Sequence, residues 1–321
     1  MKDGRLSVFI YGAGAVASCL ADIFCRAGHS VCMASDKERA RELCECGLIV
    51  KNPESEAIHE WNVEVLLDLP EHLFFDLIFI ALPLNELPKK LPFLARNKSR
   101  NLVFCSNTAG NLDSFLSYIG KERVLFCLPA CGGFKDGLEM NCLWGSGIER
   151  VLQPTVVGSA IGSKRASALQ SIFCGLGIPC ELSADIDGTL KAHALIISAI
   201  SAALNAFDGD IFSLSNDKDA MDLLVLSVRE GLSSLSSCGI QLPLHLKRWL
   251  HIPQSIIRHS WTTIFSLPAA EIALARPIYT RKTENIILRK QLSSILKGAS
   301  GSCNSWLYLE PSLQHYLMGK S

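Results

Sequence analysis

Residues 6–36 read LSVFIYGAGAVASCLADIFCRAGHSVCMASD, and this stretch decides the fold class. The apolar run Leu6–Tyr11 predicts a buried strand, and Ala15–Ala27 has the periodicity of a helix that ends at Gly28. Val31–Ala34 predicts a second strand. The order strand, turn, helix, strand is typical of an α/β fold with a parallel sheet.

The turn in this unit has the spacing G-x-G-x-x-A. Gly12 allows a tight turn, Gly14 lets the backbone approach a pyrophosphate, and Ala17 permits close packing of the helix on the strand. The phosphates then lie at the helix N-terminus, where free N–H groups point at the anion. Asp36 stands at the end of the second strand, where an acid can bind a ribose. The expected cofactor contacts are Gly12, Ala13, Gly14, Ala15, Val16, Ala17 and Asp36.

Two other interpretations of this stretch compete with a dinucleotide site. Small residues also fill tight turns in α/β folds that bind no cofactor. Lys2 and Arg5 before an apolar run that ends at Cys19 also resemble a lipoprotein signal peptide. Asp3 and the glycines inside the run argue against export, so dinucleotide binding is the favoured interpretation.

The composition sets limits on size, partners and compartment. The chain has 321 residues, 49% of them hydrophobic, which is enough for two domains with sizeable cores. A net charge of +0 argues against nucleic acid as a partner, and the longest uncharged stretches, 6–21 and 192–207, are too short and too rich in small residues for a membrane span. Thirteen cysteines with no C-x-x-C pair, and no histidine nearby at zinc-finger spacing, predict no metal site. Unpaired thiols suit a cytoplasmic location.

The first half of the chain alternates strands with helical stretches such as 37–45 and 163–175, as in a doubly wound parallel sheet. The expected strands are 6–10, 31–34, 61–65, 77–81, 102–105, 124–127, 155–157 and 180–182. After residue 184 only helical periodicity remains, at 187–207, 218–238, 243–252, 253–265 and 268–296, with a loop at 298–304 and a final helix near 313–318. We therefore expect an α/β protein with an N-terminal Rossmann domain, 1–183, and an all-helical C-terminal domain for substrate binding and dimerisation, 184–321.

Seven phrases in order along the chain extend the pattern beyond the cofactor turn. They are GAGAVA at 12–17, GHSV at 28–31, CGL at 46–48, SNTAG at 106–110, LPACGGF at 128–134, DIDGTLKAH at 185–193 and CGIQLP at 238–243. This series resembles the ketopantoate reductase family. The resemblance implies a Rossmann domain, a helical domain of the 6-phosphogluconate dehydrogenase C-terminal type, and NADPH-dependent reduction of a 2-oxo acid.

The resemblance also assigns roles to residues and marks departures. It implies that Lys191 is catalytic, that Asn107 and Ala130 contact the cofactor, and that an acid such as Glu284 contacts the substrate. The family's two asparagines after the lysine are Leu195 and Ala199 here, and its lysine after the fourth strand is replaced by Leu82 or Pro83. These departures predict a substrate bulkier or less anionic than ketopantoate.

Lys191 is also the residue that carbonyl chemistry favours. Hydride addition to carbon builds charge on oxygen, and a lysine among apolar neighbours is suited to act as the general acid. Ser198 and Asn205 follow at i+7 and i+14 on the same helical face and are candidate substrate contacts. His193 lies about 200° around the helix from Lys191. It is more simply a packing residue.

Each assignment has a structural alternative. In these alternatives, Lys191 only extends its side chain to water at the end of a buried helix, and Asn107 caps the helix near Leu112. Residues 130–133 form a plain loop, and Glu284 lies on a solvated helix face, which is the favoured interpretation for that residue.

The nicotinamide cofactor is expected to be NADP(H) or NAD(H). Asp36 favours NAD(H), because a carboxylate repels a 2′-phosphate. The family favours NADP(H), and Lys37 or Arg39 could pair with the phosphate.

Three functions remain in competition. The favoured one is an NAD(P)H-dependent oxidoreductase that reduces a 2-oxo acid or a related carbonyl compound. An opine-type dehydrogenase shares the two-domain plan but needs a His–Asp pair. A non-catalytic dinucleotide-binding or redox-sensing protein is the third. The expected partner is a small-molecule substrate, and the oligomeric state stays open, with a homodimer as one option.

Overall fold

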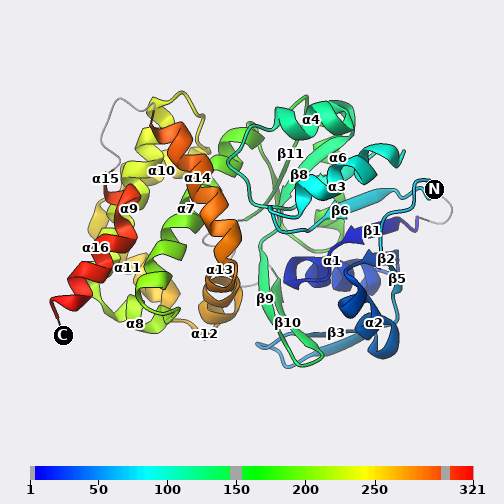
Figure 1. Ribbon diagram of the computed structural model, residues 1–321, viewed down its shortest axis with the longest axis horizontal. Coiled ribbons are helices and arrows are strands. Elements are labelled where there is room, and N and C mark those ends of the chain that lie inside the picture. The colour runs from blue at the N-terminus through cyan, green and yellow to red at the C-terminus, as the bar shows by residue number, and fades with distance from the viewer. Residues whose placement is uncertain (1–3, 145–153, 298–303, 321) are drawn as a thin grey trace. The chain divides into compact units, whose positions relative to one another are not determined.

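The structure is a computed structural model that describes residues 4–144, 154–297 and 304–320 (Figure 1). The chain divides into two compact units. Unit 1 comprises Met1–Ser106 and Asn111–Ile186, and unit 2 comprises Asn107–Gly110 and Asp187–Ser321. The loop Asn107–Gly110 therefore groups with the C-terminal unit, although the residues on both sides of it belong to unit 1. The domain boundary expected after residue 183 stays a prediction.

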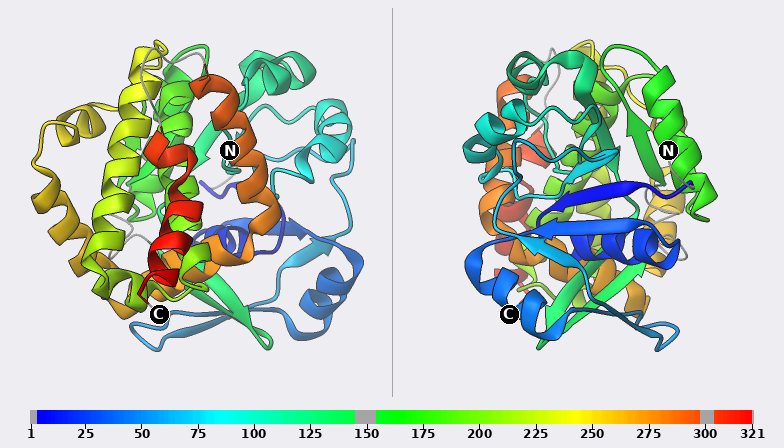
Figure 2. Two further views of the ribbon diagram at one scale, coloured as in Figure 1. Left: turned by 60° about the vertical axis from the view of Figure 1, so that its left-hand side comes forward. Right: turned by 90° about the vertical axis from the view of Figure 1, so that its right-hand side faces the viewer.

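Unit 1 is built on an eight-stranded sheet in the order β12-β11-β8-β7-β6-β1-β2-β5 (Figure 2). The strands are β1 (Ser7–Tyr11), β2 (Ser30–Ala34), β5 (Glu64–Leu66), β6 (Leu77–Ile80), β7 (Leu102–Phe104), β8 (Val124–Leu128), β11 (Thr155–Gly158) and β12 (Cys180–Leu182). All neighbours pair in parallel except β11 and β8. Strands β6 and β8 are buried along their whole length, which explains their continuous apolar sequence. The predicted doubly wound parallel sheet is confirmed.

A second, four-stranded sheet in the order β4-β3-β10-β9 was not predicted from the sequence. Its strands are β3 (Leu48–Lys51), β4 (Ile58–Trp61), β9 (Cys131–Asp136) and β10 (Glu139–Trp144). The single strand expected at 61–65 is wrong, because β4 ends at Trp61 and β5 of the other sheet begins at Glu64. Helix α1 (Ala15–Arg26) packs against β1 and β2 of the large sheet and against β9 and β10 of the small one.

A buried carboxylate ties α1 to the small sheet. Asp22 of α1 accepts hydrogen bonds from Trp61 Nε1 and from His59 Nδ1, each at 2.8 Å. A buried charge needs such partners to offset its loss of hydration. The other helices that the structure describes in unit 1 are α2 (Lys37–Cys46), α3 (Leu87–Arg96), α4 (Asp113–Ile119), the 3-10 turn η1 (Lys121–Arg123) and α6 (Lys164–Gly175). The expected helices at 37–45 and 163–175 are confirmed to within a residue.

Every regular element that the structure describes after residue 186 is a helix, so the all-helical prediction for this part is confirmed. The helices are α7 (Ile186–Ala206), α8 (Ile211–Asn216), α9 (Lys218–Ser237), α10 (Leu244–Trp249), α11 (Gln254–Phe265), α12 (Pro268–Ala270), the π-helical η2 (Glu271–Ala275), α13 (Arg276–Thr280), α14 (Lys282–Leu296), α15 (Asn304–Leu307) and α16 (Leu309–Met318). The final helix begins earlier than expected. The loop expected at 298–304 lies almost wholly outside the described residues.

The single helix expected over 268–296 is wrong, because the chain breaks twice. Pro277 has no N–H to donate to the preceding turn, and the backbone before it forms the π-helical segment η2. At Arg281 the backbone leaves the helical region, with φ −89° and ψ 46°. Asn285 Nδ2 then donates to the carbonyl oxygen of Ile278 at 2.7 Å and closes the end of α13.

Helix α7 is long and apolar enough, by length and composition alone, to cross a membrane. However, 72% of its most apolar window is buried within the protein, as in a core helix. Leu195 of α7 packs against Gly231 of α9, where even a β-carbon would lie 2.7 Å from the leucine side chain. This close approach shows why the centre of α7 is apolar.

Candidate functional site

The expected cofactor turn joins β1 to α1 and requires glycine at its first position. Gly12 has φ +122°, and a β-carbon there would lie 2.5 Å from the carbonyl oxygen of Ala81. Its N–H donates to the carbonyl oxygen of Ala34 at 2.8 Å, which fixes the turn to the end of β2. The tight turn inferred from the spacing therefore has a steric cause.

Gly14 opens the way to the start of α1. It is the N-cap residue, with φ −82° and ψ −173°, and no side chain caps the helix. The first N–H bonded within the helix is that of Ser18, which donates to the carbonyl oxygen of Gly14 at 2.9 Å. The N–H groups of Ala15, Val16 and Ala17 have no acceptor within the helix. A β-carbon at Gly14 would meet no atom within 4 Å, so this end of α1 has room for a phosphate group.

Asp36 is exposed and performs a structural task as well. It is the N-cap of α2, and its Oδ1 accepts the backbone N–H of Arg39 at 3.0 Å. The cap uses one carboxylate oxygen, so the other remains for a ribose hydroxyl.

Arg39, a candidate partner for a 2′-phosphate, is directed to another residue. Its side chain is 11% exposed and contacts Glu42 at 2.7 Å, and Lys135 Nζ contacts the same carboxylate at 2.6 Å. Burial favours a higher pKa for Glu42, but the bonds from Lys135 and Arg39 outweigh it and lower the pKa of this carboxyl. Lys37 remains exposed beside Asp36.

A polar cluster at the carboxyl end of β1 was not found from the sequence. The Tyr11 hydroxyl donates to Asp68, and Lys90 Nζ of α3 contacts the other carboxylate oxygen at 3.0 Å. Burial, and then the neighbouring Asp68, raises the pKa of Tyr11. No spacing in the sequence connects residues 11, 68 and 90, so only the fold reveals the cluster.

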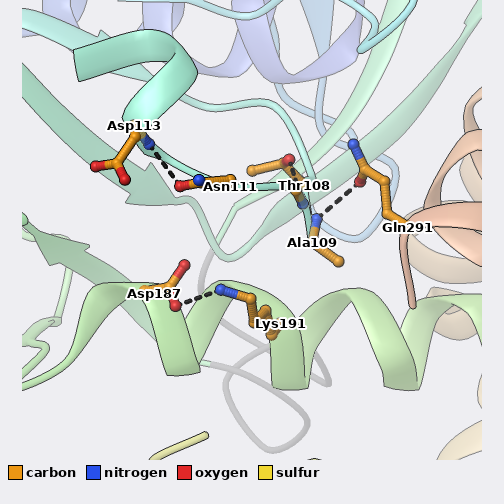
Figure 3. A network of polar contacts seen from close by, with 8 residues as sticks. Thr108, Ala109, Asn111, Asp113, Asp187, Lys191 and Gln291 are labelled. Atoms are coloured by element: carbon orange, nitrogen blue, oxygen red, sulfur yellow. Dashed lines mark hydrogen bonds and ion pairs between the residues drawn. The ribbon is translucent and has the colours of Figure 1, made fainter. Parts of the chain in front are cut away.

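In unit 2, Lys191 is buried in α7, with 8% of the residue exposed. Its ammonium group contacts the carboxylate of Asp187 one turn earlier, and the Asp187 side chain is 40% exposed (Figure 3). The ammonium group of this buried lysine thus lies beside a partly exposed carboxylate, and the role of Lys191 stays a prediction. Ser198 is buried further along α7, and Asn205 is half-buried near its end. The spacing i, i+4 on one helix indicates Asp187 as a partner of Lys191, and this signal is present in the sequence.

His193 of α7 is half-buried, and burial lowers its pKa to about 4. A neutral histidine at pH 7 agrees with the packing role that its position on the helix predicts.

The loop Asn107–Gly110 is held by α14. Ala109 N–H donates to Oε1 of Gln291 at 3.0 Å (Figure 3). Asn107 itself is half-buried. Its alternative role as a cap of the helix near Leu112 is wrong, because no side chain caps α4. Asn111 Oδ1 accepts the N–H of Asp113 at 2.9 Å just before that helix.

The other two expected contacts are Glu284 in unit 2 and Ala130 in unit 1. Glu284 of α14 is 3% exposed, so its expected place on a solvated helix face is wrong; its carboxylate lies 3.6 Å from Arg281 Nη1. In unit 1 the N–H of Ala130 donates to Thr155 Oγ1 at 2.9 Å and is therefore engaged within the protein. Residues 131–133 lie in β9 rather than in a loop. A cofactor contact at Ala130 stays a prediction.

The turn and Asp36 lie in a part of the chain that is similar to a known family. Residues 8–146 match the family model described as Ketopantoate reductase PanE/ApbA. The match covers less than half of the 321 residues. This match supports the class of NAD(P)-dependent oxidoreductases for the protein.

Solved structures of the ketopantoate reductase fold are similar over nearly the whole chain. A 2-dehydropantoate 2-reductase from Geobacter metallireducens GS-15 has a TM-score of 0.74 at 13% identity, over 97% of this chain and 99% of that one. A D-mandelate dehydrogenase with NADH and anilino(oxo)acetate has a TM-score of 0.72 at 15% identity, over 98% of each chain. A 2-dehydropantoate 2-reductase from Methylococcus capsulatus has a TM-score of 0.68 at 14% identity, over 98% of each chain. No curated protein sequence matches the chain.

The departures from the ketopantoate reductase pattern have structural counterparts. Leu195 packs on Gly231, and Ala199 is buried, so neither position carries the amide that the family has there. The carbonyl oxygen of Leu82 accepts a hydrogen bond from Ser106 Oγ at 2.6 Å. Lysine is absent at both Leu82 and Pro83, so an anionic substrate would lack that partner.

Proposed function

We propose that the protein is an NAD(P)H-dependent reductase of a 2-oxo acid or a related carbonyl compound, with Lys191 as the general acid. The observation that carries this proposal is the buried Lys191 paired with Asp187, in a chain whose residues 8–146 match the ketopantoate reductase family model. A buried ammonium group is costly unless it is paired. A dry site also strengthens its attraction for an alkoxide.

The residues divide the work of the reaction. The turn Gly12–Ala17 would hold the pyrophosphate and Asp36 the ribose of the nicotinamide cofactor, which supplies the hydride when bound. As the carbonyl carbon accepts the hydride, Lys191 Nζ gives its proton to the carbonyl oxygen and an alcohol forms. The partly exposed Asp187 holds Nζ in place and links it to solvent, from which the lysine regains its proton.

We infer a 2-oxo acid bulkier or less anionic than ketopantoate as the substrate. The apolar Leu195 and Ala199 replace two amides, and no lysine stands at Leu82 or Pro83. The D-mandelate dehydrogenase with the same fold holds anilino(oxo)acetate, a 2-oxo acid with an aromatic group, together with NADH. An aromatic group of that kind suits a site in which apolar side chains such as Leu195 and Ala199 replace amides.

For the cofactor we favour NADH. Asp36 keeps one carboxylate oxygen for the ribose, and the Arg39 guanidinium is directed to Glu42. NADPH is the second candidate, since the family favours it and Lys37 is exposed beside Asp36.

The test is the 340 nm absorbance of NADH or NADPH mixed with the protein and 2-oxo acids, among them ketopantoate and phenylglyoxylate, with and without amino acids. Turnover without an amino acid supports the proposal. Turnover only with an amino acid indicates the opine-type alternative, for which a His–Asp pair exists at His59 and Asp22, though in unit 1. Cofactor binding with no turnover indicates the non-catalytic alternative. A cytoplasmic location and a homodimer remain further proposals.

A further inference from the structure

The loop Asn107–Gly110 is attached to a helix that is far away in the sequence. Ala109 N–H donates to Gln291 Oε1 at 3.0 Å, across a separation of 182 residues. Ala109 is buried, and a buried N–H without a partner would be costly. The Gln291 side chain supplies the partner that regular secondary structure does not supply here.

A second contact shows that the glutamine amide lies against the loop. A β-carbon on Gly110 would be 2.8 Å from Gln291 Nε2, so the absence of a side chain makes room for the amide. Thr108 Oγ1 accepts the N–H of Gly110 at 3.1 Å and fixes the turn from within. The Gln291 amide therefore bonds to Ala109 through Oε1, as Figure 3 shows, and its Nε2 lies close to Gly110.

The loop follows a strand that lies close to the switch point of the large sheet. Chain order reverses between β6 and β1, which are neighbours in the large sheet, and β7 is the next strand beyond β6. In open α/β sheets, ligands bind beyond the carboxyl ends of strands beside such a switch point. The loop leaves the sheet at that end of β7, yet it belongs to the same compact unit as Lys191.

We propose that Gln291 is a positioning residue that fixes the loop carrying Asn107 relative to Lys191. This inference rests on the proposed function, because it gives the loop a task in the same reaction. Gln291 does not touch the reacting atoms. It acts by holding the Ala109 backbone, so that the Asn107 side chain keeps one place within unit 2 as the substrate reacts. Small misplacements of reacting groups cost about 100-fold in rate.

The test compares three variants on α14. Gln291→Ala removes both contacts, Gln291→Glu keeps an acceptor for Ala109 N–H, and Lys290→Ala is an exposed control one residue away. We expect kcat to fall at least tenfold in Gln291→Ala and to recover in Gln291→Glu to within a few-fold of wild type. A kcat for Gln291→Ala equal to that of Lys290→Ala would overturn the proposal.

Hydrogen–deuterium exchange gives a readout independent of turnover. The peptide containing Ala109 should exchange faster in Gln291→Ala than in wild type, Gln291→Glu or Lys290→Ala. Gly110→Ala displaces the amide from the other side and should have the same effect, since Gly110 has no positive φ and tolerates a side chain in its backbone geometry. Unchanged exchange would show that Gln291 does not hold the loop. If wild type reduces no 2-oxo acid but the variants change the exchange, the proposed function fails while the attachment of the loop to Gln291 stands.

Discussion

In unit 1 the candidate pyrophosphate contacts come from one continuous piece of backbone, whereas in unit 2 the candidate site residues lie on three separate segments. The turn Gly12–Ala17 depends on a steric limit at Gly12 and on N–H groups at a helix start. The unit 2 residues depend on a salt bridge within α7 and on a bond between Ala109 and Gln291. A backbone site can be recognised from spacing alone, whereas a side-chain site depends on tertiary contacts.

Replacing Lys191 should have the largest effect. Lys191→Ala removes the proposed acid, and we expect kcat to fall by about 10²–10⁴, the usual contribution of general acid catalysis. Cofactor binding should change little, because the turn belongs to the other unit. Steady-state assays and fluorescence titration of the cofactor measure both, with the exposed Lys218→Ala as the control. Turnover of Lys191→Ala within a few-fold of wild type would leave this lysine a structural role only.

The two glycines of the turn should respond in opposite ways. Gly14→Val leaves the fold intact, because its β-carbon meets open space, but it occupies the place of the pyrophosphate and should weaken cofactor binding about 100-fold. Gly12→Ala forces a side chain against the Ala81 carbonyl at φ +122°, and should lower the free energy of unfolding by more than about 2 kcal/mol. Thermal melting and cofactor titration separate the two effects. Equal melting temperatures for both variants would contradict the steric argument.

The elements that could be predicted from the sequence are those set by local periodicity. The strand–turn–helix unit and α7, α9 and α11 follow from residues close together in the chain. The small sheet does not, because β3 pairs in parallel with β10, in the register Glu139↔Ile49, and nothing near either strand specifies that partner. The break at residues 271–281 was missed because apolar periodicity continues across it, although Pro277 marked the place.

In the candidate site, too, local features could be predicted from the sequence and distant contacts could not. Asp187 could have been found from its spacing to Lys191, since i and i+4 are neighbours on a helix. Gln291 could not, because a glutamine on a helix carries no signal that its partner is the backbone of Ala109. The burial of Glu284 was likewise hidden, since a charged residue on a helix is usually solvated.

His193 lies on the face of α7 opposite Lys191, so its contribution to stability can be tested apart from catalysis. Burial lowers the pKa of His193 to about 4, below the unfolded value of about 6.5, so folding favours the neutral ring. This stability is present above pH 6.5 and is lost as pH falls towards 4, by about 2 kcal/mol between pH 7 and pH 5. Urea unfolding of wild type, His193→Gln and the exposed His315→Gln at both pH values measures it. An equal pH dependence in wild type and His193→Gln would refute this contribution.

The smallest expected effect is on the preference between NADH and NADPH. It tests whether the Asp36 side chain adds to the binding that the backbone turn of unit 1 provides. We expect wild type to bind NADH about tenfold more tightly than NADPH, a difference of about 1.4 kcal/mol. Asp36→Ser keeps an N-cap oxygen for Arg39 N–H but removes the charge, so it should narrow the preference without melting α2. Glu38→Gln, an exposed acid on the first turn of the same helix, is the control. Fluorescence titration of both cofactors decides the matter: a tenfold preference of wild type for NADPH would mean that Lys37 or Arg39 outweighs the carboxylate of Asp36.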